Sequence, residues 1–185
     1  SETTIGIIGV GRIGLGVLRH LQGFGPIKIL LNDIAPNHDL VKKFNIEWVD
    51  KEKIYQQADI VTIHVPLTSK TKNMVKSTQL LNMKKDAIII NTARGGIINE
   101  HDLYNVLQAG HLSGAAIDVF DLEPYNGKLQ DIKRCVLTAH MGSMSFDCRA
   151  RMEIEATEEA VRFLTNQPLR SIVPEEEYAV QREGL

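Results

Sequence analysis

Short apolar runs recur through residues 1–145 and alternate with segments of helical period. Several runs lack a polar face; residues 87–90, for example, are all alanine or isoleucine. Continuous runs of this kind are typical of strands that are covered on both faces, which predicts a parallel sheet. The seven candidate strands are residues 5–10, 27–32, 47–49, 59–64, 87–91, 114–118 and 135–138.

The segments between these strands have the spacing of amphipathic helices. In residues 99–109, Leu103 and Val106 share one face, Asn99 is placed to cap the amino terminus, and Gly110 follows as a stop signal. Strands that alternate with helices predict right-handed crossovers. We therefore expect an α/β fold, a Rossmann-like doubly wound parallel sheet.

The last forty residues have a different pattern. Residues 144–166 predict one long acidic helix with Ile154 and Val161 in its apolar stripe, and Pro168 ends it. An extended segment is expected next, and the acidic run at 175–177 is expected to be a solvated surface.

Composition limits the function classes. The chain has 185 residues, of which 43% are hydrophobic and 24% are charged, and these values exclude bulk disorder. A net charge of −2 gives no basic surplus for nucleic acid or an anionic membrane. No apolar run reaches the roughly 20 residues of a membrane span, and Ser1–Thr4 do not resemble the start of a secretory signal. Two cysteines form no disulfide framework, so we expect a cytoplasmic protein, and we expect no metal site.

A glycine pattern, G-V-G-R-I-G at residues 9–14, follows the first predicted strand and opens a predicted helix. In a dinucleotide-binding turn, the first glycine (Gly9) permits the turn and the second (Gly11) lets a pyrophosphate approach the backbone. The third (Gly14) allows the helix to pack closely on the strand. A glycine-rich turn with a purely steric cause is the alternative. A P-loop is excluded, because no Gly-Lys-Ser/Thr follows.

Asp33 ends the second predicted strand, nineteen positions after Gly14. A carboxylate at this spacing accepts hydrogen bonds from the adenosine ribose and repels a 2′-phosphate, which favours NAD over NADP. The alternative is that Asp33 is a turn residue ahead of Ala35 and Pro36.

Three further segments include the carboxyl ends of predicted strands, at the edge where open α/β sheets bind ligands. They are residues 91–96, 114–124 and 137–143, and they contain Arg94 and His140. Arginine binds a carboxylate with two parallel hydrogen bonds. Histidine exchanges protons near pH 7, and a neighbouring carboxylate orients it and stabilises its charged form. The alternatives are an arginine in a surface ion pair, a loop carboxylate at Glu123 and a core histidine.

Taken together, these motifs resemble the D-isomer-specific 2-hydroxyacid dehydrogenase family. The resemblance runs from the glycine pattern through His64-Val65-Pro66-Leu67-Thr68, residues 92–96 and residues 118–124 to His140, over about 140 residues. It implies that Arg94 holds the substrate carboxylate and carbonyl, His140 is the acid and base, and Glu123 is its partner. Ala139 departs from the proline that often precedes the histidine in this family.

The resemblance also implies NAD as cofactor and a set of residues around it. Asp118 is expected to contact the nicotinamide carboxamide, and His64 is expected to form a wall rather than to catalyse. The cofactor-binding residues expected on this basis are Gly9, Gly11, Arg12, Ile13, Gly14, Asp33, His64, Val65, Pro66, Thr92, Ala93, Asp118 and Gly142.

Members of this family have two domains, with the active site between them. The resemblance thus implies an NAD-binding domain at 1–143, while 144–185 form a crossing helix and a C-terminal segment of a substrate domain whose larger part lies outside the chain. On this view the chain binds NAD with little turnover; a native short protein is the alternative. A homodimer through the NAD-binding domain is also implied.

The expected substrate is a small 2-hydroxy or 2-oxo acid. Phosphoglycerate, glyoxylate, hydroxypyruvate and lactate all fit, and residues 64–68 with Lys72-Asn73-Met74 lie somewhat closer to phosphoglycerate dehydrogenases. A second function class stays open, because corepressor-type relatives resemble the enzymes and use the same fold as an NADH-responsive module that binds protein partners. Turnover of simple 2-oxo acids distinguishes the two classes.

Overall fold

The computed structural model describes residues 3–173 of the chain. It divides the chain into two compact units, Ser1–Ala139 and His140–Leu185, which we describe separately. The acidic run predicted to be solvated, residues 175–177, lies outside the described residues.

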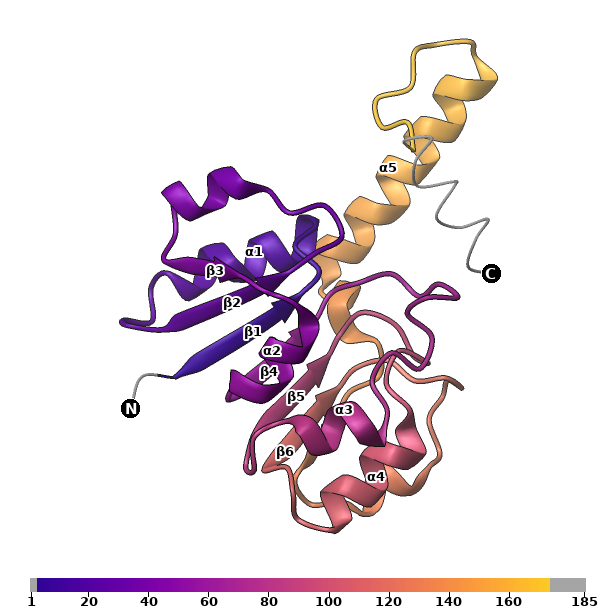
Figure 1. The fold of residues 1–185 in the computed structure, drawn as a ribbon. Coiled ribbons are helices and arrows are strands. Elements are labelled where there is room, and N and C mark those ends of the chain that lie inside the picture. Colours follow the sequence, from indigo (N-terminus) through magenta and orange to yellow (C-terminus); the bar gives the residue numbers. More distant parts are fainter. Residues whose placement is uncertain (1–2, 174–185) are drawn as a thin grey trace. The chain divides into compact units, whose positions relative to one another are not determined.

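The first unit is built on a seven-stranded sheet in which every neighbouring pair is parallel (Figure 1). The strand order is β3-β2-β1-β4-β5-β6-β7, so the chain winds outward from β1 in one direction and then from β4 in the other. This confirms the Rossmann-like doubly wound fold, and each of the seven predicted strands is present. Their bounds are β1 Thr4–Ile8, β2 Lys28–Asn32, β3 Ile46–Trp48, β4 Ile60–Ile63, β5 Ile88–Asn91, β6 Gly114–Ile117 and β7 Cys135–Leu137.

Helices lie on both faces of this sheet. On one face, Leu18 of α1 packs with Ile7 and Leu31. On the other face, α2, α3 and α4 contribute apolar side chains such as Ile54 and Leu103 to the larger core. The helices are α1 Arg12–Leu21, α2 Lys51–Gln57, α3 Ser77–Asn82 and α4 Glu100–Gln108, with 3-10 turns η1 at His38–Lys42 and η2 at Lys128–Asp131.

Helix α4 begins and ends as its sequence predicts. The Asn99 side chain accepts a hydrogen bond from the Asp102 amide at 3.0 Å, which satisfies one of the free N–H groups of the first turn. Gly110 follows the helix with a φ of +75°, a left-handed conformation that glycine adopts without a steric cost.

The expectation that the apolar strands are covered on both faces is wrong for the β5–β7 half of the sheet. Ile88 is 36% exposed and Val136 is 64% exposed. The register pairs Ile90 with Ala116 and Ala116 with Val136, so these side chains share a face with Ile88. A continuous apolar run thus marks a parallel strand correctly without showing that both its faces are buried.

The second unit begins with η3, Met141–Ser143, followed by the helix α5, Phe146–Leu164. The long helix is confirmed, but it is shorter than the predicted 144–166. It begins later because the Ser145 hydroxyl accepts the Cys148 amide at 3.3 Å and caps it. It ends earlier because Asn166 takes a φ of +54°. Among the described residues, no helix has both the length and the apolar character to cross a membrane.

Candidate functional site

The carboxyl ends of β1 and β4 lie side by side where the winding of the sheet reverses, and ligands bind at this point in open α/β sheets. Gly9 follows β1 and His64 follows β4. The Gly9 amide donates to the Asn32 carbonyl at 2.9 Å, and the His64 amide donates to the Ile8 carbonyl at 2.7 Å. Both loops are therefore anchored to the edge of the sheet.

The three glycines of the 9–14 turn have different steric surroundings. Gly9 has a φ of +92°, and a Cβ placed on it would lie 2.6 Å from the His64 carbonyl carbon. A Cβ on Gly14 would lie 2.0 Å from the Gly9 carbonyl oxygen, whereas a Cβ on Gly11 would meet nothing within 4 Å. The protein's own packing thus requires the first and third glycines but not the second. The open space at Gly11 fits a ligand that approaches the backbone.

Gly11 is also the residue that precedes α1, and it offers no side chain to cap the helix. The first turn of α1 carries no acidic residue. The N–H groups of the first turn and the positive end of the helix dipole are therefore suited to an anion such as a pyrophosphate.

Asp33 is held beside the glycine turn. Its Oδ2 accepts the Val10 amide at 2.7 Å, and its Oδ1 accepts the Ala35 amide at 2.9 Å. The turn role considered for Asp33 is thus present in the structure, and it places the carboxylate next to residues 9–14. A carboxylate has about four acceptor positions, so two amide contacts leave it able to accept ribose hydroxyls.

Residues 64–66 follow β4, and His64 and Val65 lie against Gly9. The Nε2 atom of His64 lies 3.0 Å from the Thr62 hydroxyl, and burial lowers the pKa of the imidazole. A lowered pKa favours the neutral imidazole. Val65 contacts the position that a Cβ of Gly9 would take, and the Pro66 carbonyl accepts the Thr71 hydroxyl at 2.6 Å.

Asn91 organises the loop that presents Arg94. This side chain is 2% exposed; its Oδ1 accepts the Ala93 amide at 3.0 Å and its Nδ2 donates to the Arg94 carbonyl at 2.9 Å. Thr92 and Arg94 are exposed, with an Arg94 guanidinium nitrogen 2.7 Å from the Ala93 carbonyl. The sequence motifs indicated no role for Asn91, although it is a polar residue that closes an apolar strand.

The loop after β6 carries Asp118 and Glu123. Asp118 is buried, its amide donates to the Asn91 carbonyl at 3.0 Å, and its carboxylate accepts the Thr138 hydroxyl. Glu123 is exposed and its Oε1 accepts the Phe120 amide at 3.0 Å. Thr138 was another residue without a predicted role, although it follows a strand beside His140.

Arg94 and Glu123 lie on loops that touch each other. A Cβ on Gly95 would lie 1.9 Å from the Phe120 carbonyl oxygen, so only glycine allows this approach of the two backbones. Glu123 also lines a cavity of about 580 Å³, together with Phe120, Tyr125 and Thr138. The structure thus brings the predicted arginine and carboxylate loops together at the carboxyl edge of the sheet.

His140 and Gly142 belong to the second unit. His140 is exposed, precedes η3, and has a left-handed backbone with φ of 52° and ψ of 53°. Gly142 lies inside η3 and is also exposed. Residues other than glycine are uncommon in the left-handed region, because the strain costs about 1–3 kcal/mol. Those that do adopt it cluster at functional sites.

A doubly wound parallel sheet with a glycine turn at its reversal point defines a dinucleotide-binding domain. Residues 1–142 match the model of the D-isomer specific 2-hydroxyacid dehydrogenase, NAD binding domain. The chain therefore belongs to the D-isomer-specific 2-hydroxyacid dehydrogenase family, and NAD is the cofactor of the matched domain.

Individual proteins agree with this assignment. The chain is 37% identical to a glyoxylate reductase from Korarchaeum cryptofilum, over 98% of the chain and 55% of that protein. It is 34% identical to a D-3-phosphoglycerate dehydrogenase from Bacillus subtilis, over 92% of the chain and 32% of that protein. The NAD-complexed D-isomer specific 2-hydroxyacid dehydrogenase from Lactobacillus delbrueckii superposes with a TM-score of 0.82 at 29% identity, covering 93% and 56% of the two chains. The chain spans about half the length of these relatives or less.

Proposed function

We propose that this chain provides the NAD-binding domain of an enzyme that interconverts a 2-hydroxy acid and a 2-oxo acid. The observation that carries the proposal is the contact between the Arg94 and Glu123 loops on a nucleotide-binding sheet, made through Gly95 and Phe120. An arginine and a carboxylate at one edge supply a substrate clamp and a partner for a proton carrier.

NAD, when bound, supplies or accepts the hydride at C2 of the substrate. Arg94 binds the substrate carboxylate through its planar fork and orients the neighbouring carbonyl. In reduction, charged His140 donates a proton to the oxygen at C2; in oxidation, neutral His140 accepts it. Glu123 stabilises the charged imidazole.

The proposed cofactor site follows from the loops at the sheet edge. Gly11 and the first backbone amides of α1 face the pyrophosphate, Asp33 accepts the ribose hydroxyls, and Asp118 contacts the carboxamide. The remaining proposed contacts are Gly9, Arg12, Ile13, Gly14, His64, Val65, Pro66, Thr92, Ala93 and Gly142.

For the substrate we propose a small 2-oxo acid of the glyoxylate or hydroxypyruvate type, with phosphohydroxypyruvate as the second candidate. Relatives named for glyoxylate support the first, and the 64–74 segment supports the second. The test is NADH oxidation by the full-length protein with phosphohydroxypyruvate, hydroxypyruvate, glyoxylate and pyruvate. Turnover of one of these establishes the activity. Tight NADH binding without turnover would instead support an NADH-responsive binding module.

We expect Asp33→Ala to narrow the preference for NADH over NADPH. The native carboxylate accepts ribose hydroxyls and repels a 2′-phosphate, and alanine does neither. Fluorescence titration of both cofactors measures the ratio of dissociation constants, which should fall by about tenfold, the effect of roughly 1.4 kcal/mol. Equal affinity of the unmodified protein for both cofactors would remove Asp33 from this role.

We also propose a homodimer formed through the NAD-binding domain, in the cytoplasm. The exposed side chains of Ile88 and Val136 lie on one face of β5–β7 and support the dimer, because apolar side chains that adjoin on a surface favour association. Cys135 and Cys148 are both free thiols, as suits a reducing compartment. Sedimentation that shows only monomer at tens of micromolar would contradict the dimer.

A further inference from the structure

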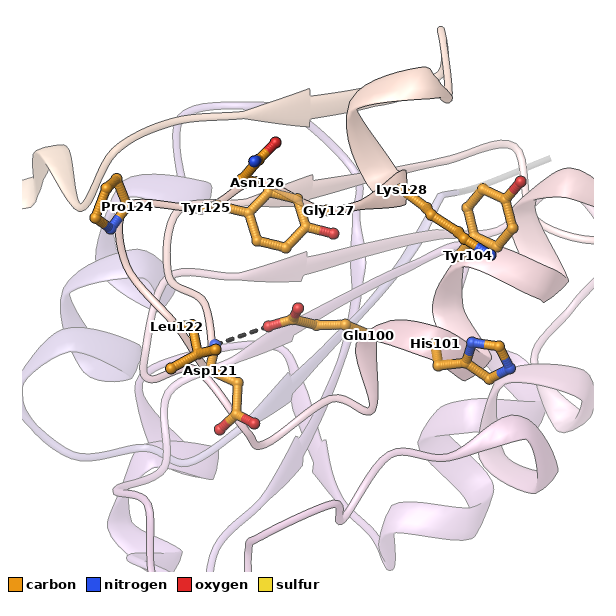
Figure 2. A pocket seen from close by; sticks show the side chains of 10 residues that line it. All are labelled: Glu100, His101, Tyr104, Asp121, Leu122, Pro124, Tyr125, Asn126, Gly127 and Lys128. Carbon is orange, nitrogen blue, oxygen red and sulfur yellow. Dashed lines mark hydrogen bonds between the residues drawn. The ribbon is translucent and has the colours of Figure 1, made fainter.

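The first residue of α4 makes a hydrogen bond to the loop that carries Glu123. The Oε1 atom of Glu100 accepts the backbone N–H of Asp121 at 2.7 Å. Figure 2 shows the Glu100 side chain reaching from α4 to this loop, beside a cavity of about 410 Å³ that Tyr104, Tyr125 and Lys128 also line. The contact joins two segments that are 21 residues apart in the sequence.

Side-chain contacts fix the start and the end of the 118–125 loop, whereas the middle of the loop is exposed. At its start, Asp118 accepts the Thr138 hydroxyl. Near its end, the rings of Phe120 and Tyr125 stack with centroids 4.1 Å apart. Between them, Asp121 is exposed and Leu122 is 82% exposed, so burial does little to fix this part. The hydrogen bond from Glu100 acts at this weakly buried point.

A shift of the loop middle reaches Glu123 directly. The Phe120 amide donates to the Glu123 carboxylate at 3.0 Å, and Asp121 is the next residue along the chain. The orientation of the Glu123 carboxylate therefore depends on the backbone at 120–121. That backbone is held by Glu100 through the Asp121 amide, and it lies against Gly95.

We propose that Glu100 is a positioning residue, which fixes the 118–125 loop through the Asp121 amide and so orients the Glu123 carboxylate. This inference rests on the proposed function. Burial and the nearby Asp121 carboxylate raise the pKa of the Glu100 side chain, whereas the hydrogen bond from the Asp121 amide lowers it. The ionised form of Glu100 is therefore disfavoured by its surroundings, apart from this hydrogen bond. If Glu100 served only to interact with the helix dipole, its carboxylate could remain in solvent.

Asp102 provides a matched control within the same helical turn. Its carboxylate also accepts a backbone amide, that of Ser77 at 2.8 Å, but this contact leads to α3 rather than to the Glu123 loop. Asp102→Ala therefore removes an acidic first-turn residue and a comparable hydrogen bond without touching residues 118–125.

The experiment compares Glu100→Met, Glu100→Gln and Asp102→Ala in the full-length protein. Methionine keeps the length and apolar stem of the side chain and loses the acceptor; glutamine keeps an acceptor oxygen. For Glu100→Met we expect kcat of reduction to fall about tenfold, since small misplacements of reacting groups are costly. The alkaline limb of its pH profile should move about 0.5 unit lower, because a displaced Glu123 stabilises the charged acid less.

The two companion variants separate positioning from folding. Glu100→Gln should keep the kcat and the pH profile of the unmodified protein. Asp102→Ala should lower Tm about as much as Glu100→Met does, but it should leave kcat and the pH profile unchanged. The NADH dissociation constant should stay within about twofold in all three, because Asp118 is held by Thr138 and Asn91. If Glu100→Met does not fold, Glu100→Ala replaces it in the same comparison.

An unchanged pH profile in Glu100→Met, or an equal shift in Asp102→Ala, would overturn the inference. Glu123→Gln identifies which claim has failed. If Glu123→Gln moves the alkaline limb and Glu100→Met does not, only the positioning role is wrong. If Glu123→Gln leaves the limb in place, the proposed role of Glu123 is wrong and the inference about Glu100 falls with it.

Discussion

Replacing His140 with alanine should lower the turnover of a 2-oxo acid by about 10²–10⁴, the usual contribution of general acid catalysis. The oxygen at C2 develops negative charge as reduction proceeds, and without the imidazole no positioned group delivers its proton. The NADH dissociation constant should stay unchanged, because the glycine turn and Asp33 lie on the first unit, away from His140 in the chain. Steady-state kinetics and fluorescence titration measure the two quantities.

The backbone of His140 calls for a second variant. Alanine is strained at its φ of 52°, while asparagine tolerates the left-handed region. His140→Asn should therefore lose as much turnover as His140→Ala with a smaller loss of stability. His101→Ala, on the exposed start of α4, is a histidine control that should retain activity. A wild-type kcat in His140→Asn would remove this residue from the catalytic role.

Gly14→Ala should weaken NADH binding by at least about tenfold and lower the free energy of unfolding by about 1–3 kcal/mol, the usual cost of overpacking. The added Cβ would lie 2.0 Å from the Gly9 carbonyl oxygen, a backbone atom that moves only if the whole turn moves. Chemical denaturation and NADH titration follow the two effects.

Gly16→Ala is the matched control, on the same helix two residues later. A Cβ on Gly16 would meet nothing within 4 Å. Alanine should therefore stabilise α1 by about 0.5–1 kcal/mol, since it loses less backbone entropy than glycine does, and NADH affinity should not change. Equal losses from Gly14→Ala and Gly16→Ala would show that the steric explanation for Gly14 is wrong.

The strands and their parallel pairing could be predicted because each depends on a local pattern of apolar residues. Seven runs predicted seven strands, and the alternation with helices predicted the winding of the sheet. The local pattern was less informative about what covers a strand. The apolar run at 87–90 predicts that Ile88 is buried, but the exposure of this residue depends on elements distant in the sequence.

The supporting contacts of the candidate site were harder to predict for the same reason. Asn91, Thr138 and Glu100 act on loops that approach one another only after folding, and no spacing rule links Glu100 to Asp121. Glycines were equally ambiguous: Gly14 and Gly16 share a helix, and only the three-dimensional structure shows that one of them has no room for a methyl group.

The close approach at Gly95 affects how this domain can be recombined with its relatives. The backbone of Phe120 fits against residue 95 only if that residue has no side chain, so the two loops must fit each other although 24 residues separate them. A chimera that takes the β6 loop from a relative should fold well only if the segment around Gly95 comes from the same parent. Exchanging only one of the two segments would bring together a residue 95 and a β6 loop from different parents, whose backbones need not pack closely.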